Sequence, residues 1–185
     1  LAPSPAGRRR VVLSTDIAES SLTVEGVRVV VDGGQVRRPR YDGRAGMSRL
    51  HTAASSRASA DQRAGRAGRL GPGVAYRVWS EGEHAGRRPF TPPEIAGADL
   101  TDLALELAVW GGGADLAFLD PPPPGALAQA EELLTRLGAI DDAGRPTAAG
   151  RRMVELPLHP RLAHLVVVDR TRLACVLAAP LEERD

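Results

Sequence analysis

The chain has 185 residues, of which 43% are hydrophobic and 25% charged, so it is long enough for one or two globular domains. Its single cysteine, Cys175, excludes an internal disulfide, and no apolar run approaches the roughly 18 residues of a membrane-spanning helix. All 24 basic residues are arginine, and a chain without lysine has no phosphate-binding loop of the Gly-x-x-x-x-Gly-Lys-Ser/Thr type.

The net charge of +1 hides an asymmetry between the two halves of the chain. Residues 1–90 carry 16 arginines against 8 acidic residues, a net +8, whereas residues 91–185 carry 8 against 15, a net −7. This separation predicts a polyanionic partner for the first half. The first ten residues, LAPSPAGRRR, lack the apolar core of a signal peptide, so the expected location is the cytoplasm.

The first part of the chain predicts short strands and a hairpin. Val11–Leu13 and Val27–Val31 are apolar runs typical of buried strands in a parallel sheet that is covered on both faces. The segment between them is too short for a full crossover helix. Residues 35–57 are polar and basic around the turn-forming YDGR at 41–44, which predicts a β-hairpin projecting from the sheet.

An unusual arginine repeat follows in the stretch ASADQRAGRAGRLGPG, residues 58–73. Ser59 is the expected N-cap of a short helix through this repeat, and Val74–Trp79 after it is predicted to be another strand. Glycine is unfavourable inside helices and like charges repel, so such a sequence is costly for a plain surface helix.

The spacing of the repeat predicts which side chains converge. On a helix, Gln62, Arg66 and Arg69 share a face because they are spaced by four and then three residues, whereas Arg63 is rotated by about 100° from Gln62. An amide and two guanidiniums on one face form a good clamp for phosphoryl oxygens, and the intervening glycines leave room for close approach. The alternative is that Ser59 and Gln62 form a capping box and the arginines a solvated face; spacing alone favours neither.

The second half predicts helices. Residues 80–93 have the composition of a linker. A helix is then predicted from the three- and four-residue spacing of its apolar stripe, Leu100, Leu103, Leu107 and Trp110. The prolines at 121–124 precede a second helix, whose predicted apolar stripe is Leu127, Ala130, Leu133, Leu134 and Leu137. Thr147 is expected to cap a third helix after two short strands around residues 142–144. Helices combined with a small hairpin predict a winged helix, and residues from His159 onward are again helical.

Two motifs resemble those of a known family. The stretch DQRAGRAGR at 61–69 resembles motif VI of superfamily 2 helicases in its DEAH-box form, and STDIAESSLTVEGVRVVVDGG at 14–34 resembles motif V of that group. Residues 99–111, 118–141 and 147–163 resemble the winged-helix and helical region that follows, although Pro146 stands where the last pattern usually begins. The resemblance covers residues 11–185.

The resemblance implies an α/β RecA-like (P-loop NTPase-type) partial lobe, then an α+β winged helix and the start of a helical bundle. We expect the C-terminal part of the second RecA-like lobe at 1–82, a linker at 83–94, the winged helix at 95–157 and the start of the helical domain at 158–185. The implied parent protein is an ATP-dependent RNA helicase. Its first lobe, with the lysine loop and the D-E-x-H motif, is missing from this sequence, so we expect the isolated chain not to hydrolyse ATP.

The resemblance also implies roles for the arginine repeat. The motif VI glutamine and its second and third arginines face the γ-phosphate of ATP in that family, which assigns catalytic and ATP-binding roles to Gln62, Arg66 and Arg69. Arg69 is the expected arginine finger, and Arg63 is expected in a structural or interlobe salt bridge. The implied cofactor is ATP with Mg²⁺, whose metal ligands would lie on the first lobe; the four histidines lack partners at metal-ligand spacing, so no metal site is expected in this chain.

Single-stranded RNA, or alternatively DNA, is the implied polyanion. The resemblance to motif V implies that Ser14 and Thr15 contact the phosphate backbone of the nucleic acid, with local capping of the protein's own backbone as the alternative. Asp16 departs from the asparagine that is common at this position in the family. The other candidates for nucleic-acid contact are the arginines of the predicted hairpin: Arg37, Arg38, Arg40, Arg44 and Arg49. The alternative is that the hairpin is a solvated loop whose arginines reflect codon usage. The competing function is a winged-helix nucleic-acid binder without nucleotide chemistry, which the acidic second half disfavours.

Overall fold

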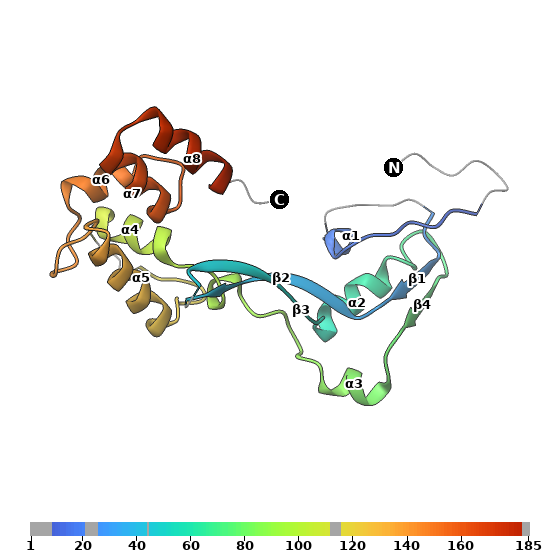
Figure 1. The fold of residues 1–185 in the computed structure, drawn as a ribbon. Helices are drawn as coiled ribbons and strands as arrows, with labels where there is room; N and C mark the ends of the chain where they lie inside the picture. The colour runs from blue at the N-terminus through green and yellow to red at the C-terminus, as the bar shows by residue number, and fades with distance from the viewer. Residues whose placement is uncertain (1–8, 21–25, 44, 112–115, 183–185) are drawn as a thin grey trace. The chain divides into compact units, whose positions relative to one another are not determined.

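The computed structural model describes residues 9–20, 26–43, 45–111 and 116–182 (Figure 1). The chain forms two units: the first comprises residues up to 39 together with 49–92, and the second comprises residues 40–48 together with those from 93 onward. The elements in chain order are α1 (Ile17–Ser20), β1 (Val29–Asp32), β2 (Gln35–Asp42), β3 (Met47–Ala54), α2 (Arg57–Gly65), β4 (Val74–Arg77), α3 (Glu81–Gly86), the 3₁₀ turn η1 (Glu94–Ala96), α4 (Thr101–Trp110), α5 (Pro124–Arg136), α6 (Ala148–Val154), α7 (Pro160–Asp169) and α8 (Arg172–Glu182).

The predicted parallel sheet is formed by β1 and β4. Val29 pairs with Val74 and Val31 with Tyr76, and α2 packs against both strands. These four side chains lie on one face because they alternate with the residues between them, and each is at least half exposed. The prediction that both faces of the sheet are covered is therefore wrong for this face.

The strand predicted at Val11–Leu13 is not formed. Residues 9–15 have no regular secondary structure, and Val11 and Leu13 are 86% and 93% exposed. A strand requires a hydrogen-bonded neighbour, and within the described residues β1 pairs with β4 and β2 with β3. Apolar composition alone therefore did not determine the structure of this segment.

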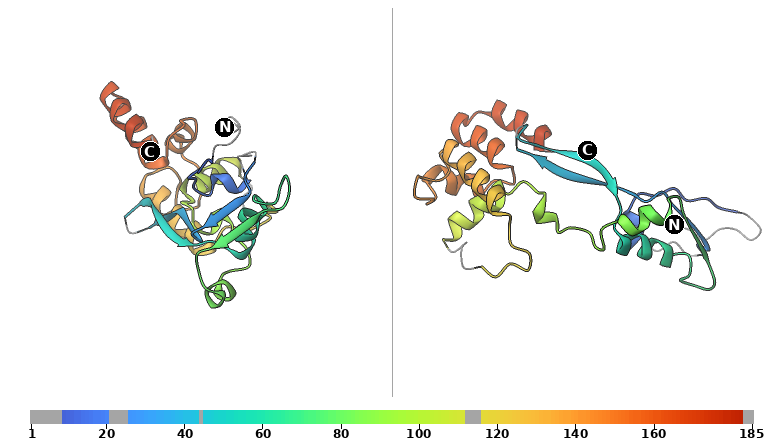
Figure 2. Two further views of the ribbon diagram at one scale, coloured as in Figure 1. Left: turned by 90° about the vertical axis from the view of Figure 1, so that its right-hand side faces the viewer. Right: turned by 90° about the horizontal axis from the view of Figure 1, so that it is seen from below.

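The predicted hairpin is present as β2 and β3, which lie side by side in Figure 1 and in the right-hand view of Figure 2. Residues 43–46 connect the two strands, and Gly46 adopts a φ of 64°, a conformation that favours glycine. Arg44 lies outside the described residues.

The segment with linker composition contains a helix. Ser80 caps α3 through its Oγ, which accepts the Glu83 N–H at 3.2 Å, while the Glu83 carboxylate accepts the Ser80 N–H at 2.8 Å. This reciprocal pair is a capping box, which satisfies two donors at the start of the helix. Residues 81–86 are therefore more ordered than their glycine and charge content predicted.

The core of the second unit is formed by α4, α5, α6 and α7. The predicted stripe of α5 is confirmed, since Ala130, Leu133 and Leu134 are buried, and Thr147 caps α6 as predicted. The stripe predicted for α4 is partly wrong: Leu100 is buried, but Trp110 is 74% exposed. In place of the two short strands predicted around residues 142–144, the structure has one isolated antiparallel β-bridge between Ile140 and Pro146.

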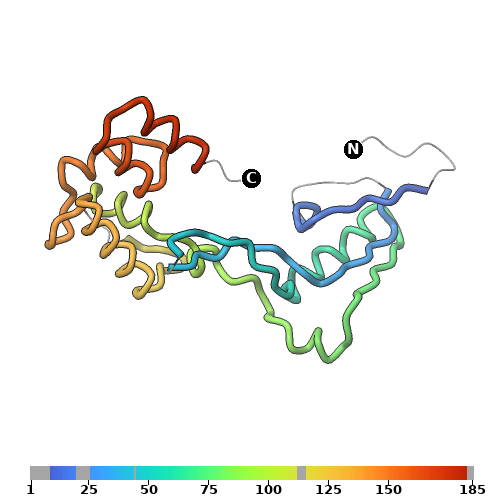
Figure 3. The backbone as a smooth tube through the Cα atoms, viewed as in Figure 1, coloured from blue at the N-terminus to red at the C-terminus, as the bar shows by residue number. Residues whose placement is uncertain are grey.

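The C-terminal part is helical as predicted, with α7 ending at Asp169 and α8 beginning at Arg172 (Figure 3). The tube shows a tight connection between these two helices. No described helix has both the length and the apolar character required to span a bilayer.

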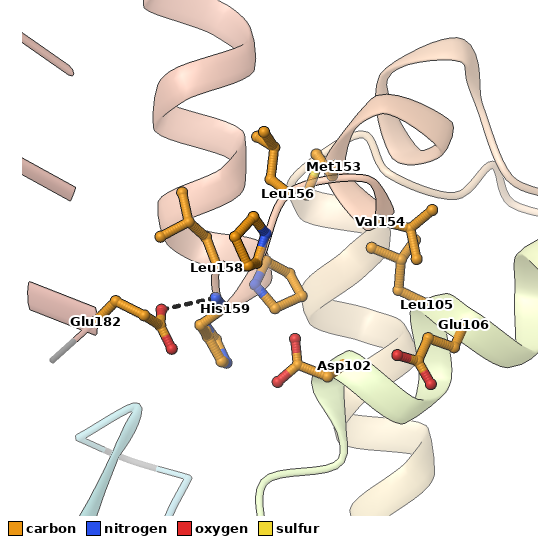
Figure 4. A pocket seen from close by; sticks show the side chains of 11 residues that line it. Asp102, Leu105, Glu106, Met153, Val154, Leu156, Leu158, His159 and Glu182 are labelled. Atoms are coloured by element: carbon orange, nitrogen blue, oxygen red, sulfur yellow. Dashed lines mark hydrogen bonds between the residues drawn. The ribbon is translucent and has the colours of Figure 1, made fainter. Parts of the chain in front are cut away.

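His159 joins α7 and α8 to the segment just before α4, beside a pocket of about 260 Å³ (Figure 4). Its Nδ1 accepts the Arg161 N–H at 3.2 Å at the start of α7, so Nε2 carries the proton and donates to Asp99 Oδ2 at 3.1 Å. Its backbone N–H donates to Glu182 Oε2 of α8 at 2.8 Å. Burial raises the pKa of the neighbouring Asp102, an effect that His159 opposes and that the carboxylates of Asp99 and Glu182 increase.

Asp99→Ala is expected to destabilise this unit by about 2–3 kcal/mol near neutral pH, because it removes both the His159 contact and an acceptor for Thr101. Burial acts to raise the pKa of Asp99, but hydrogen bonds from His159 and Thr101 outweigh it and hold the pKa below its ordinary value of 3.8. The stabilisation is therefore present above that value and is lost as the pH falls through the folded-state pKa.

Urea unfolding of the chain at pH 7 and at progressively lower pH measures this effect. Asp142→Ala, at an exposed position, is the control and is expected to change stability by less than about 0.5 kcal/mol. A destabilisation by Asp99→Ala that persists unchanged in strong acid would contradict the proposed role of the carboxylate.

Candidate nucleotide-binding site

Helix α2 begins three residues earlier than predicted. Its N-cap is Ser56, whose Oγ accepts the Ser59 N–H at 3.1 Å. The predicted cap at Ser59, and with it the capping box between Ser59 and Gln62, is therefore wrong. Ser59 instead donates from its Oγ to the carboxylate of Glu19 in α1.

The arginine repeat crosses the end of α2, so the prediction of one helix through the repeat is also wrong. The helix ends at Gly65, Arg66 lies in the turn that follows, and Arg69 lies in the bend after that turn. The N–H groups of Arg66 and Ala67 each bond to a carbonyl three residues back at 3.1 Å, as in a 3₁₀ turn.

Gln62, Gly65, Arg66 and Arg69 line one open pocket of about 400 Å³, together with Glu19. A Cβ added to Gly65 would meet no atom within 4 Å, so the backbone here can be approached closely. The three residues predicted to converge are thus brought to one place. The pocket presents two guanidiniums and an amide, a donor set suited to phosphoryl oxygens.

Glu19 holds Arg66 in the pocket. Its backbone carbonyl accepts from Arg66 Nε at 3.0 Å and also from Arg66 Nη2. A guanidinium has five N–H donors, so donors remain on Arg66 after these two bonds. In the sequence, the one signal that marks Glu19 is its place in the stretch that resembles motif V.

Arg63 points away from the pocket, as the spacing predicts. Its Nη1 lies 3.0 Å from Asp32 Oδ1 and 3.2 Å from the Gln35 carbonyl, and its Nε lies 3.2 Å from Glu19 Oε2. The side chains of Arg63 and Asp32 are 14% and 6% exposed. The expected structural salt bridge is confirmed, and it joins α2 to α1 and to the end of β1.

Two families match the sequence. Residues 2–71 match the family described as "Helicase conserved C-terminal domain", and residues 130–158 match "Helicase associated domain (HA2), winged-helix". A crystal structure of the Escherichia coli DExH-box NTPase HrpB matches the fold with a TM-score of 0.93 at 43% sequence identity, covering 100% of this chain and 23% of that one. The chain is a DEAH-box helicase C-terminal region.

Curated relatives of the chain are also helicases by name. The chain is 44% identical to the ATP-dependent RNA helicase HrpB of Escherichia coli (strain K12), over 98% of this chain and 23% of that protein. It is 39% identical to the pre-mRNA-splicing factor ATP-dependent RNA helicase prp22 of Schizosaccharomyces pombe, over 94% of this chain and 15% of that protein. This helicase region thus spans less than a quarter of the length of these relatives.

The motif V candidates of this helicase region lie just before α1. Ser14 and Thr15 are both exposed, and Ser14 Oγ donates to the Thr15 carbonyl at 3.0 Å. Ser14 therefore makes the local backbone bond that was the alternative to RNA contact. Its hydroxyl oxygen still has acceptor capacity, but its proton is engaged.

The hairpin arginines of this helicase region differ in their surroundings. Arg37 and Arg40 are exposed on β2, whereas Arg38 is half-buried and donates from Nη2 to Thr91 Oγ1 at 3.0 Å. Arg49 is exposed on β3. Within the described part of the chain, no group of three or more His, Cys, Asp or Glu side chains is placed to hold a metal ion.

Proposed function

We propose that the parent of this region is an ATP-dependent RNA helicase and that the pocket of Gln62, Arg66 and Arg69 is one wall of its ATP site. The convergence of these three side chains on one pocket supports the proposal. Arg69 is exposed, so its guanidinium can reach a ligand bound between two lobes. Arg66 is oriented by the Glu19 carbonyl, so less side-chain freedom is lost when a phosphate binds.

The chemistry assigned to these residues is electrostatic. Arg69 acts as the arginine finger and stabilises negative charge on the transferring phosphoryl group, while Gln62 and Arg66 hold the γ-phosphate oxygens. ATP binds with Mg²⁺, which neutralises phosphate charge, and its ligands belong to the first RecA-like lobe of the parent. The lysine loop and the D-E-x-H carboxylates also belong to that lobe, so these 185 residues alone hydrolyse no ATP.

The same proposal assigns a domain to each part of the chain. Residues 1–82 belong to the second RecA-like lobe, 83–94 to a linker, 95–157 to the winged helix and 158–185 to the start of the helical domain. The partner of the lobe is single-stranded RNA or DNA, contacted by Thr15, by the hairpin arginines and by Ser14, whose exposed hydroxyl would exchange its bond to the Thr15 carbonyl for one to a phosphate oxygen. The proposed location is the cytoplasm.

Replacing Arg37, Arg38 and Arg40 together by glutamine is expected to weaken RNA binding by the parent helicase. Each phosphate contact on a single strand contributes about −0.7 to the slope of log K against log salt, so the magnitude of the slope falls by about 2. Titration of labelled single-stranded RNA at several salt concentrations measures this change, and a parallel titration of DNA of the same sequence compares the two nucleic acids.

The matched control replaces three arginines of the winged-helix region, Arg136, Arg151 and Arg152, all of them exposed. This control is expected to leave the slope unchanged. The opposite pattern, with loss only in the control, would contradict the hairpin assignment and favour a winged-helix nucleic-acid binder.

A further inference from the structure

The base of the β2–β3 hairpin is closed by a cluster of residues outside the nucleotide pocket. Gly34 immediately precedes β2 and Ser55 immediately follows β3, and the Ser55 N–H donates to the Gly34 carbonyl at 2.9 Å. Arg87 Nη1 donates to that same carbonyl at 2.7 Å and to Ser55 O and Oγ at 3.1 Å each. One guanidinium thus holds both ends of the hairpin. We name Gly34, Ser55, Trp79 and Arg87 the hairpin clamp.

Arg87 is itself held in place by Trp79. Its guanidinium carbon lies 4.0 Å from the centre of the Trp79 ring, a cation–π arrangement. Gly34 has a φ of 70°, and a Cβ added there would lie 2.5 Å from Arg87 Nη2 and 2.6 Å from the Trp79 ring. Gly34 is therefore required both by its backbone conformation and by the close approach of the Arg87–Trp79 stack.

The chain that follows Arg87 caps the helix that leads into the pocket. The carbonyls of Arg88 and Pro89 accept the N–H groups of Arg57 and Ala58, the first two residues of α2, at 2.9 and 3.0 Å. These donors would otherwise be without partners within the helix. The clamp and the start of α2 are therefore fixed by the same short segment.

A second connection links the clamp to the arginine repeat. Asp32 Oδ1 accepts the Gly34 N–H at 2.8 Å and also pairs with Arg63 Nη1 at 3.0 Å. Gly34 therefore bonds through its carbonyl to Arg87 and through its N–H to the carboxylate that holds Arg63. All of these residues belong to the first unit.

We propose that Arg87 is a positioning residue that couples the hairpin to the nucleotide pocket. By joining both ends of the hairpin to the segment that caps α2, Arg87 makes the hairpin base and α2 one rigid body. A change at the pocket then moves the point from which the hairpin leaves the lobe, and RNA on the hairpin acts back on the pocket. Arg87 contacts neither ATP nor RNA in this scheme, which rests on the proposed helicase function.

The test uses Arg87→Gln and Arg87→Lys in the full-length parent, with Arg88→Gln as the matched control. Arg88 is exposed, and the glutamine variant retains the backbone carbonyl that caps α2. For Arg87→Gln we expect basal ATP hydrolysis to stay within about twofold of the unmodified enzyme, while RNA stimulation and duplex unwinding fall by roughly tenfold, within the usual range of coupling between sites. Arg87→Lys should recover little, because lysine cannot reproduce the planar donor fork and the ring stack.

Amide hydrogen exchange provides a readout that does not depend on activity. Exchange at Ser55 and in the first turn of α2 should become faster in both Arg87 variants and remain unchanged in the control. Trp79→Leu should reproduce both the exchange and the uncoupling, and it keeps the proposal testable if Arg87→Gln does not fold.

The outcomes separate the two proposals. Unchanged RNA stimulation and unwinding in both Arg87 variants and in Trp79→Leu would overturn the coupling role while leaving the helicase function intact. A parallel loss of basal and RNA-stimulated turnover would also overturn it, because that pattern indicates a general structural role. Absence of RNA-stimulated hydrolysis in the unmodified parent would overturn the proposed function, and the coupling role with it.

Discussion

Arg69→Ala in the parent helicase is expected to lower kcat for RNA-stimulated ATP hydrolysis by about 10³-fold or more, the range attributed to arginine fingers. The reason is that Arg69 is exposed and lines the same pocket as Gln62 and Arg66, where we propose that the γ-phosphate binds and develops negative charge. KM for ATP should change far less than kcat, because an interaction made mainly in the transition state contributes little to ground-state binding. Single-turnover hydrolysis with saturating ATP measures the effect.

Two further variants sharpen this prediction. Arg69→Lys should remain strongly impaired, since a point charge does not reproduce the planar fork of a guanidinium. Arg152→Ala, at an exposed position of α6, is the control and should retain full turnover. A tenfold or smaller loss in Arg69→Ala, combined with a large loss in Arg66→Ala, would assign the finger to Arg66 instead.

The parts of the fold that sequence analysis predicted correctly are those set by local pattern. The stripe of α5 places Ala130, Leu133 and Leu134 in the core because helical spacing alone determines which face is apolar. Thr147 caps α6 for a similarly local reason. The convergence of Gln62, Arg66 and Arg69 was also predicted from their spacing, and all three line one pocket although α2 ends at Gly65.

The parts that sequence analysis missed are set by residues distant along the chain. The segment SSRAS offers serines at 55, 56 and 59 as caps, and the start of α2 is fixed by carbonyls of Arg88 and Pro89 that no local rule identifies. Glu19 and Arg63 meet across 44 positions in the sequence. Arg87 was indistinguishable from the other arginines in an arginine-rich chain, because its function depends on Trp79 and on the two ends of the hairpin.

Arg63→Ala is expected to destabilise the first unit by about 3–5 kcal/mol, the cost of removing one partner from a buried ion pair. Asp32 is 6% exposed, and removal of Arg63 would leave this carboxylate with the Gly34 N–H at 2.8 Å but without a countercharge. Glu19 would lose the Arg63 Nε contact at the same time. The effect on activity would be secondary, since Arg63 points away from the nucleotide pocket. Urea unfolding of the chain, followed by circular dichroism, measures the change in free energy.

The double variant Arg63→Ala with Asp32→Ala should recover part of this loss, because it leaves no unpaired buried charge on Asp32. Arg77→Ala is the matched control: Arg77 also pairs with an aspartate, but Asp61 is 66% exposed, so we expect a cost below about 1 kcal/mol. A loss for Arg63→Ala no larger than that of Arg77→Ala would show that water or a rearranged donor already compensates Asp32. The ion pair between Arg63 and Asp32 would then position α1 and α2 without stabilising them. Its role would be to fix the place where Glu19 contacts Arg66 at the wall of the pocket.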